Sequence, residues 1–150
     1  MYKKMLVPLD TSGLAECVLD HVKEISTFRA IPDVVLLSVV EPVTSQTMAY
    51  MGSEGVKASE ERATSGALQY LDKIKQRLSL EKSQVTAAVV VGPPAEAILG
   101  YVEKNGVDIL VLSSHGQSGL SRWLLGSTVD KLLRRSPVPV FLVPAAECRA

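Results

Sequence analysis

Glycines and hydroxyl side chains gather between residues 113 and 128, where an apolar run gives way to a polar turn. Ser113-Ser114-His115-Gly116 follows the apolar run 107–112, and Gly126-Ser127-Thr128 comes shortly afterwards. A helix beginning near Gly126 would present backbone N–H groups that have no acceptors inside the helix, and its dipole would favour an anion there. Glycine lets the main chain approach a phosphate closely, and the hydroxyls can donate hydrogen bonds. The pattern predicts a site for a nucleotide phosphate.

Five apolar runs alternate with four amphipathic patterns along the chain. The runs predict strands at residues 4–9, 34–40, 85–91, 107–112 and 138–143. Their apolar character is nearly continuous rather than alternating, which indicates a parallel sheet covered on both faces. Apolar stripes at helical spacing are formed by Leu14, Val18, Val22 and Ile25; Ala67, Leu71, Ile74 and Leu78; Ala95, Ile98, Leu99 and Val102; and Leu125, Val129, Leu132 and Leu133. Residues 41–52 show no clear period and are predicted to form a mobile loop.

Strand–helix alternation predicts an α/β fold with a doubly wound, Rossmann-like parallel sheet and helices on both faces. Such sheets bind ligands outside the carboxyl ends of their strands. Three polar strand ends should therefore meet, namely Pro8-Leu9-Asp10, Val39-Val40-Glu41 and Ser113-Ser114-His115-Gly116. Gly119 extends the last turn and is counted with the same site. Asp10 has two readings, as a cap of the following helix or as a ligand contact.

Length and charge set bounds on the protein's class. The 150 residues fit one domain, 1–150, with a tail from about residue 145. Sixteen basic and sixteen acidic side chains leave no net charge, so no overall field favours nucleic acid or anionic lipid. The apolar runs have the length of strands, and the start of the chain turns too early for a signal peptide. A cytoplasmic protein follows as the default, with Cys17 and Cys148 read as separate thiols.

Several enzyme signatures are missing from the sequence. It contains no P-loop motif, no Gly-x-Gly-x-x-Gly after the first strand and no Gly-x-Ser-x-Gly elbow. Its two histidines and two cysteines lack the spacing of metal ligands. His115 either acts as a general base or orders its turn through hydrogen bonds. Because phosphoryl transfer also needs a metal carboxylate and a charge clamp, we expect no dedicated catalytic residue and no metal site.

Motifs along the whole chain resemble those of the universal stress protein family. They are the opening segment 3–12, Val90-Val91-Gly92-Pro93-Pro94, His115-Gly116 followed nine residues later by Gly126-Ser127, and Pro137-Val138-Pro139-Val140. The resemblance implies a five-stranded parallel sheet in the order 3-2-1-4-5 and a homodimer. It also implies binding of ATP, or of AMP or ADP, with Mg²⁺ as a companion ion.

The resemblance also assigns roles to individual residues. Asp10 would hold the ribose or adenine side, Pro8 would shape the pocket floor, and Val39 would offer main-chain groups to the adenine edge. The phosphates would lie against Gly116, Gly126, Ser127 and Thr128. Ser113 stands where nucleotide-binding members have the first motif glycine. Its side chain could weaken binding, or its hydroxyl could donate to the phosphate.

The last strand should lie at a sheet edge, with Val138, Val140 and Val143 offering an apolar row to a second copy. The resemblance implies a stress-response sensor or regulator that binds an adenine nucleotide, is at most a slow ATPase, and acts on an unknown protein partner. Two alternatives stay open. One is a family member without nucleotide that serves only in protein interactions, and the other is an adenine-nucleotide enzyme of a related fold.

Overall fold

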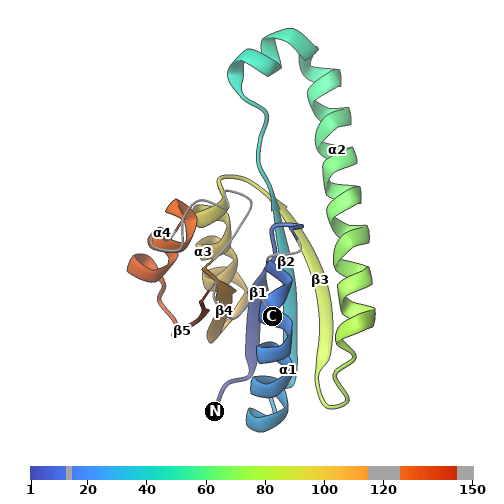
Figure 1. Cartoon of the computed structure of the whole chain (residues 1–150). Coiled ribbons are helices and arrows are strands. Elements are labelled where there is room, and N and C mark those ends of the chain that lie inside the picture. Colours follow the sequence, from blue (N-terminus) through green and yellow to red (C-terminus); the bar gives the residue numbers. More distant parts are fainter. Residues whose placement is uncertain (13–14, 115–125, 145–150) are drawn as a thin grey trace.

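A computed structural model describes residues 1–12, 15–114 and 126–144 of the chain (Figure 1). The strands are β1 Lys4–Pro8, β2 Asp33–Val40, β3 Gln84–Val91, β4 Ile109–Ser113 and β5 Val140–Val143. They form one five-stranded sheet in the order β3-β2-β1-β4-β5, and every neighbouring pair is parallel. The predicted fold class and strand order are therefore confirmed.

Helices cover both faces of the sheet. They are the 3-10 helix η1 Ala15–Cys17 and the α-helices α1 Val18–Arg29, α2 Ser45–Leu78, α3 Pro94–Asn105 and α4 Ser127–Arg135. One buried cluster joins α1 and α2 to the sheet, and a second cluster joins α3 and α4 to the opposite face. The buried residues of α2 and α3 are those of the predicted stripes: Ala67, Leu71, Ile74, Leu78, Ala95, Ile98, Leu99 and Val102.

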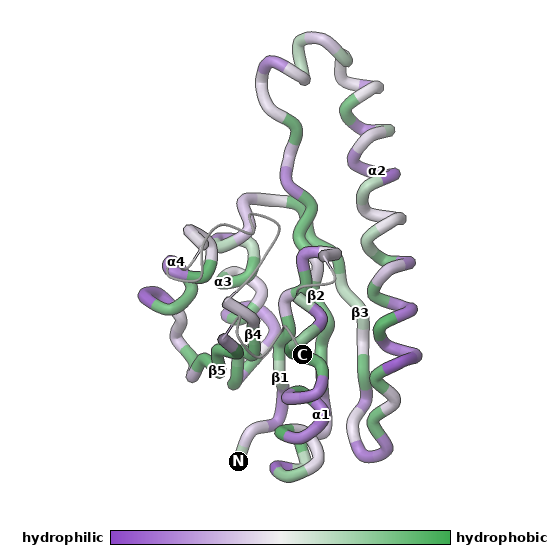
Figure 2. Tube along the Cα trace, in the orientation of Figure 1, coloured by the Kyte–Doolittle hydropathy of each residue, from purple (hydrophilic) through white to green (hydrophobic). Residues whose placement is uncertain are grey.

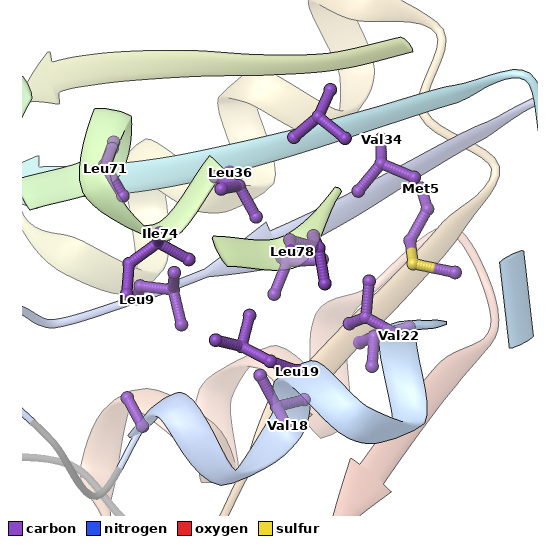
Figure 3. Packing of buried hydrophobic residues seen from close by; sticks show 14 of the residues in the cluster. Met5, Leu9, Val18, Leu19, Val22, Val34, Leu36, Leu71, Ile74 and Leu78 are labelled. Atoms are coloured by element: carbon purple, nitrogen blue, oxygen red, sulfur yellow. The ribbon is translucent and has the colours of Figure 1, made fainter. Parts of the chain in front are cut away.

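Strand side chains alternate between the two clusters, which explains why the strands are apolar over most of their length. Figure 2 shows this hydrophobic character along much of the sheet. Met5 faces α1 and α2, whereas its neighbour Leu6 packs toward α3 and α4. Figure 3 shows the first cluster, in which Leu71 and Ile74 of α2 lie over Leu36 of β2. The buried sheet thus holds the strand ends in fixed relative positions.

Direct hydrogen bonds close the amino end of the sheet. The Asp108 carboxylate accepts from the backbone N–H groups of Lys3 and Lys4, at 2.7 and 3.1 Å. On the other side, Gln84 N–H donates to the Pro32 carbonyl at 2.7 Å. Strand β4 begins at Ile109, directly after Asp108 and two residues later than the sequence predicted.

The prediction of a loop at residues 41–52 was wrong from residue 45 onward. Helix α2 begins at Ser45, where the Thr44 hydroxyl accepts from Thr47 N–H at 3.3 Å, and a kink follows at Gly52 (φ 70°, ψ 169°). The part of α2 after the kink, residues 53–78, would span about 40 Å at the usual helical rise. Figure 1 shows α2 running beside β3 and continuing beyond the sheet. The sequence lacks an apolar period there because the first half of α2 buries no side chain against the sheet.

Two smaller predictions also need correction. In α4 only Leu132 is buried, Leu133 is 38% exposed, and Leu125 lies outside the described residues. Cys17 is disulfide-bonded rather than a separate thiol, and Cys148 lies outside the described residues. Disulfides are rare in reducing compartments such as the cytoplasm, so the disulfide at Cys17 does not support the expected cytoplasmic location, which stays a prediction. Within the described ranges, no helix is both long and apolar enough to cross a membrane.

Candidate ligand pocket at the carboxyl ends of the strands

A cavity of about 660 Å³ opens at the carboxyl ends of β1, β2 and β4. It lies beside the neighbouring pair β1 and β4, where the chain order of the sheet reverses, which is the usual ligand position in such folds. The cavity is lined by Pro8, Leu9, Asp10, Ala15, Leu37, Val39, Glu41, Pro94, Ile98, Leu112, Ser113, Ser114, Gly126, Ser127, Thr128, Val129 and Leu132.

The structure brings together the predicted site residues that it describes. All eight of them line the cavity: Pro8, Leu9, Asp10, Val39, Ser113, Gly126, Ser127 and Thr128. His115, Gly116 and Gly119 lie outside the described residues. The convergence follows from parallel strands whose carboxyl ends share one edge of the sheet. It does not depend on closeness in sequence.

A tight turn after β1 fixes the position of Asp10. One carboxylate oxygen, Oδ1, accepts from the backbone N–H of Ser12 at 3.0 Å and from its hydroxyl at 2.5 Å. The Ser12 hydroxyl oxygen in turn accepts from Ala15 N–H at 3.3 Å, so Ser12 contacts the start of η1. Between them Thr11 has a φ of 66°, a left-handed conformation that is strained for a β-branched residue. The turn is thus held by side-chain hydrogen bonds at the edge of the cavity.

The opposite wall of the cavity is the start of α4. Gly126 precedes the helix with φ −57° and ψ 153°, and no side chain caps this end. Its carbonyl accepts from Asp130 N–H at 2.9 Å, so the helical ladder begins there. The N–H groups of the first turn have no acceptors within the helix, and Ser127, Thr128 and Val129 all line the cavity. This wall can bind an anion through neutral donors.

Ion pairs hold α4 against α3 and so fix that wall. Glu96, in the first turn of α3, lies 3.4 Å from the Lys131 ammonium and 3.9 Å from the Arg135 guanidinium of α4. The pKa of Glu96 is lowered mainly by a hydrogen bond from its own backbone N–H, and to a smaller extent by these two cations. The pairs are exposed, so their contribution is to the alignment of the two helices more than to stability.

An apolar section lies between the two polar walls. Leu37 and Val39 of β2 form one side, and Pro94 and Ile98 of α3 form another. Sequence reasoning missed the contribution of α3, although Pro93-Pro94 directly after β3 was a usable signal, since β3 also ends at this edge. An apolar slot beside an anion-binding helix start suits a flat base attached to a phosphate.

The charged side chains among the described lining residues are both acidic. Asp10 follows β1 and Glu41 follows β2. These carboxylates can accept hydrogen bonds from ligand hydroxyl or amino groups, or contact a cation carried by the ligand. The described lining therefore combines hydroxyls, main-chain N–H groups, two carboxylates and an apolar slot, which together can bind and orient a nucleotide.

The fold and cavity define a Rossmann-like α/β protein with a ligand site at the point where the strand order reverses. The family model described as "Universal stress protein family" matches residues 1–144, and the chain belongs to this family. It is 34% identical over 155 residues to Universal stress protein MJ0577 of Methanocaldococcus jannaschii, covering 95% of each chain. It is 29% identical to Universal stress protein YxiE of Bacillus subtilis, covering 95% of this chain and 99% of the relative.

Solved structures show the same architecture. The structure of the hypothetical protein MJ0577 matches with a TM-score of 0.82 and 35% identity, covering 95% of this chain and 96% of that one. More distant matches are a universal stress protein in complex with cAMP, one from Archaeoglobus fulgidus with dAMP, and one from Arabidopsis thaliana with AMP bound. Their TM-scores are 0.62, 0.57 and 0.59 at 16–20% identity, a likeness that shows the shared fold.

Proposed function

We propose that the chain binds an adenine nucleotide, ATP or its shorter relatives AMP and ADP, in the cavity at the strand ends. The observation that carries this proposal is the convergence of the eight described site residues on one cavity of about 660 Å³. Nucleotide complexes of structurally similar universal stress proteins with cAMP, dAMP and AMP support the choice of an adenine ligand.

Each wall has a role in this proposal. The base lies in the apolar slot against Val39, whose main-chain groups meet the adenine edge. Asp10 accepts from the ribose hydroxyls, and the phosphates lie at the start of α4 beside Ser127 and Thr128. Because the described lining has carboxylates and no basic side chain, Mg²⁺ would offset the charge of a triphosphate.

The biological role that follows is sensing rather than catalysis. We expect nucleotide occupancy to change the surface shown to an unidentified protein partner in the stress response. Hydrolysis, where it occurs, is slow. The start of α2 is the natural reporting surface, because Glu41 lines the cavity and α2 begins four residues later, at Ser45.

One observation favours a second candidate, an interaction protein that binds no nucleotide. Ser113, at the end of β4, is 7% exposed and lines the cavity at the position of the first motif glycine. A side chain there occupies space that a glycine would leave to the phosphate. Replacing Ser113 by glycine restores the motif, and a gain of affinity in that variant would identify this side chain as the obstacle.

Thermal unfolding with and without ATP and Mg²⁺ tests the proposal, with GTP as the control for base selectivity. ATP at about one hundred times its dissociation constant should stabilise the fold by roughly 2.7 kcal/mol. A shift with ATP and not with GTP supports an adenine-selective site. The absence of a shift with either nucleotide supports the interaction-only candidate.

The proposal includes a homodimer built on β5, which lies at one end of the strand order and leaves an edge unpaired within the described sheet. The three predicted interface residues are not equivalent. Val138 and Val140 are partly buried against the cluster beneath α3 and α4, whereas Val143 is fully buried in the other cluster. The main chain of β5 and the half-exposed Phe141 are therefore the groups that a second copy would meet first.

Replacing Val140 by glutamate should convert the dimer to monomers in sedimentation velocity, because a charge would enter the strand-to-strand contact. Leu133→Glu is the control for adding a charge to an apolar surface, since Leu133 is an exposed apolar residue of α4 outside β5. Dimers that persist in Val140→Glu while its circular dichroism stays native would exclude this interface.

A further inference from the structure

We infer that Glu16 is a positioning residue that connects α2 to the nucleotide site and acts through Asp10. The inference rests on the proposed function, because it concerns the affinity of that same cavity. Glu16 is the central residue of η1, between Ala15, which lines the cavity, and the disulfide-bonded Cys17. It does not itself line the cavity.

The Glu16 carboxylate holds α2 through both of its oxygens. Oε1 accepts from the Tyr70 hydroxyl at 3.1 Å, and Oε2 accepts from Arg77 Nη1 at 2.9 Å. The Glu16 side chain is 21% exposed and that of Arg77 is 62% exposed, so the ion pair is partly shielded on the Glu16 side only. Two donors that lie about two turns apart on one helix therefore fix the orientation of a single carboxylate.

A short chain of hydrogen bonds continues from η1 to Asp10. Ala15 N–H donates to both the hydroxyl and the carbonyl oxygen of Ser12, at 3.3 and 3.2 Å. Ser12 donates from its backbone and its hydroxyl to Asp10 Oδ1. The intervening Thr11 is in a strained left-handed conformation, which persists only when its surroundings hold it. A shift of η1 would therefore move the carboxylate proposed to contact the ribose.

Charge interactions follow from this proximity. Burial raises the pKa of Tyr70 above its usual range, and the charge of Glu16, its hydrogen bond and the charge of Asp10 raise it further. Arg77 opposes these effects. Because the Asp10 charge acts on Tyr70, the site carboxylate and the α2 residue share one electrostatic environment.

Two parts of α2 connect to different parts of the cavity lining. At its start, residues 42–44 join it directly to Glu41 beside Val39, on the base side. Nearer its end, Tyr70 and Arg77 hold Glu16 beside Asp10, on the ribose side. Figure 1 shows the length of helix that separates these two connections. The kink at Gly52 lies between these two connections. The part of α2 after the kink carries Tyr70 and Arg77 and is the part that Glu16 connects to the site.

Titration calorimetry with ATP and Mg²⁺ on the full chain tests the inference. Glu16→Ala should weaken binding roughly five- to tenfold, which corresponds to about 1–1.4 kcal/mol. Glu16→Gln, which keeps an acceptor for Tyr70, should restore part of the affinity. Asp108→Ala is the matched control, since it removes a carboxylate that accepts two hydrogen bonds at the opposite end of the sheet. Its affinity should equal that of the wild type.

The combination with Asp10→Asn separates positioning from general loss of structure. If Glu16 acts through Asp10, Glu16→Ala should cost little further affinity in the Asp10→Asn background. An undiminished effect there, or an equal loss in Asp108→Ala, overturns the inference. If the wild type binds ATP and Glu16→Ala binds it equally well, only the inference is overturned. If the wild type binds no nucleotide, the proposed function is overturned as well.

Discussion

The two ends of the sheet are built from the same strands but use their polar groups differently. At the amino end, Asp108 and Gln84 connect neighbouring segments by direct hydrogen bonds. At the carboxyl end, main-chain hydrogen bonds also join neighbouring segments, but the Asp10 carboxylate bonds to its own turn at Ser12, beside a cavity of about 660 Å³. Substitutions at the amino end should therefore change stability, and substitutions at the carboxyl end should change ligand affinity.

The largest effect is expected at the carboxyl end, from Gly126→Val. The φ of −57° at Gly126 is accessible to valine, so the fold should persist. The branched side chain would stand in the path of the phosphates and reduce ATP affinity at least a hundredfold, or roughly 2.7 kcal/mol. Calorimetry measures the affinity and urea unfolding measures the stability. Unchanged ATP affinity would contradict the proposal that the phosphates lie at the start of α4.

The amino end should give the reverse result. Asp108→Ala leaves the N–H groups of Lys3 and Lys4 without their acceptor, which should lower the free energy of unfolding by about 1–3 kcal/mol. ATP affinity should stay unchanged, because the cavity is at the other end of every strand. Loss of ATP affinity in a folded Asp108→Ala protein would contradict the idea that the amino end contributes to stability and the carboxyl end to ligand binding.

A smaller effect is expected from Tyr70→Phe, which removes one donor to Glu16 and should cost about 1 kcal/mol. Because folding raises the pKa of Tyr70, its stabilisation is complete below about pH 10, the unfolded value, and declines as the pH rises through the folded pKa. The wild type should accordingly lose stability above pH 10 more steeply than Tyr70→Phe. Urea midpoints measured from pH 8 to pH 11 would show this, and parallel curves would contradict it.

The smallest change should come from Glu96→Gln. Its carboxylate is fully exposed and pairs with Lys131 and Arg135 across 3.4 and 3.9 Å, so the unfolding midpoint should hardly move. ATP affinity should fall slightly, because α4 would be held less firmly against α3. The effect should vanish at high salt, which screens exposed pairs. A large loss of affinity at every salt concentration would instead place Glu96 in contact with the ligand.

Local patterns predicted much of the fold and of the candidate site. The stripe at Ala67, Leu71, Ile74 and Leu78 predicted the buried face of α2, because helical periodicity depends only on residues a few positions apart in the chain. The first half of α2 escaped prediction, since a helix that buries no side chain against the sheet carries no apolar period. Leu133 was assigned to the core wrongly, because spacing gives the stripe but not how far the neighbouring sheet extends beneath it.

The sequence by itself determined the parallel α/β class, the polar strand ends and the Gly-Ser-Thr start of α4, all of which depend on residues close together in the chain. Only the tertiary structure decided that Pro94 and Ile98 line the cavity and that Glu16 meets Tyr70, 54 positions away. It also placed Asp108 beside Lys3, across 105 positions. Such contacts arise from the packing of whole elements, whose offsets and rotations are set by the shared core rather than by local sequence.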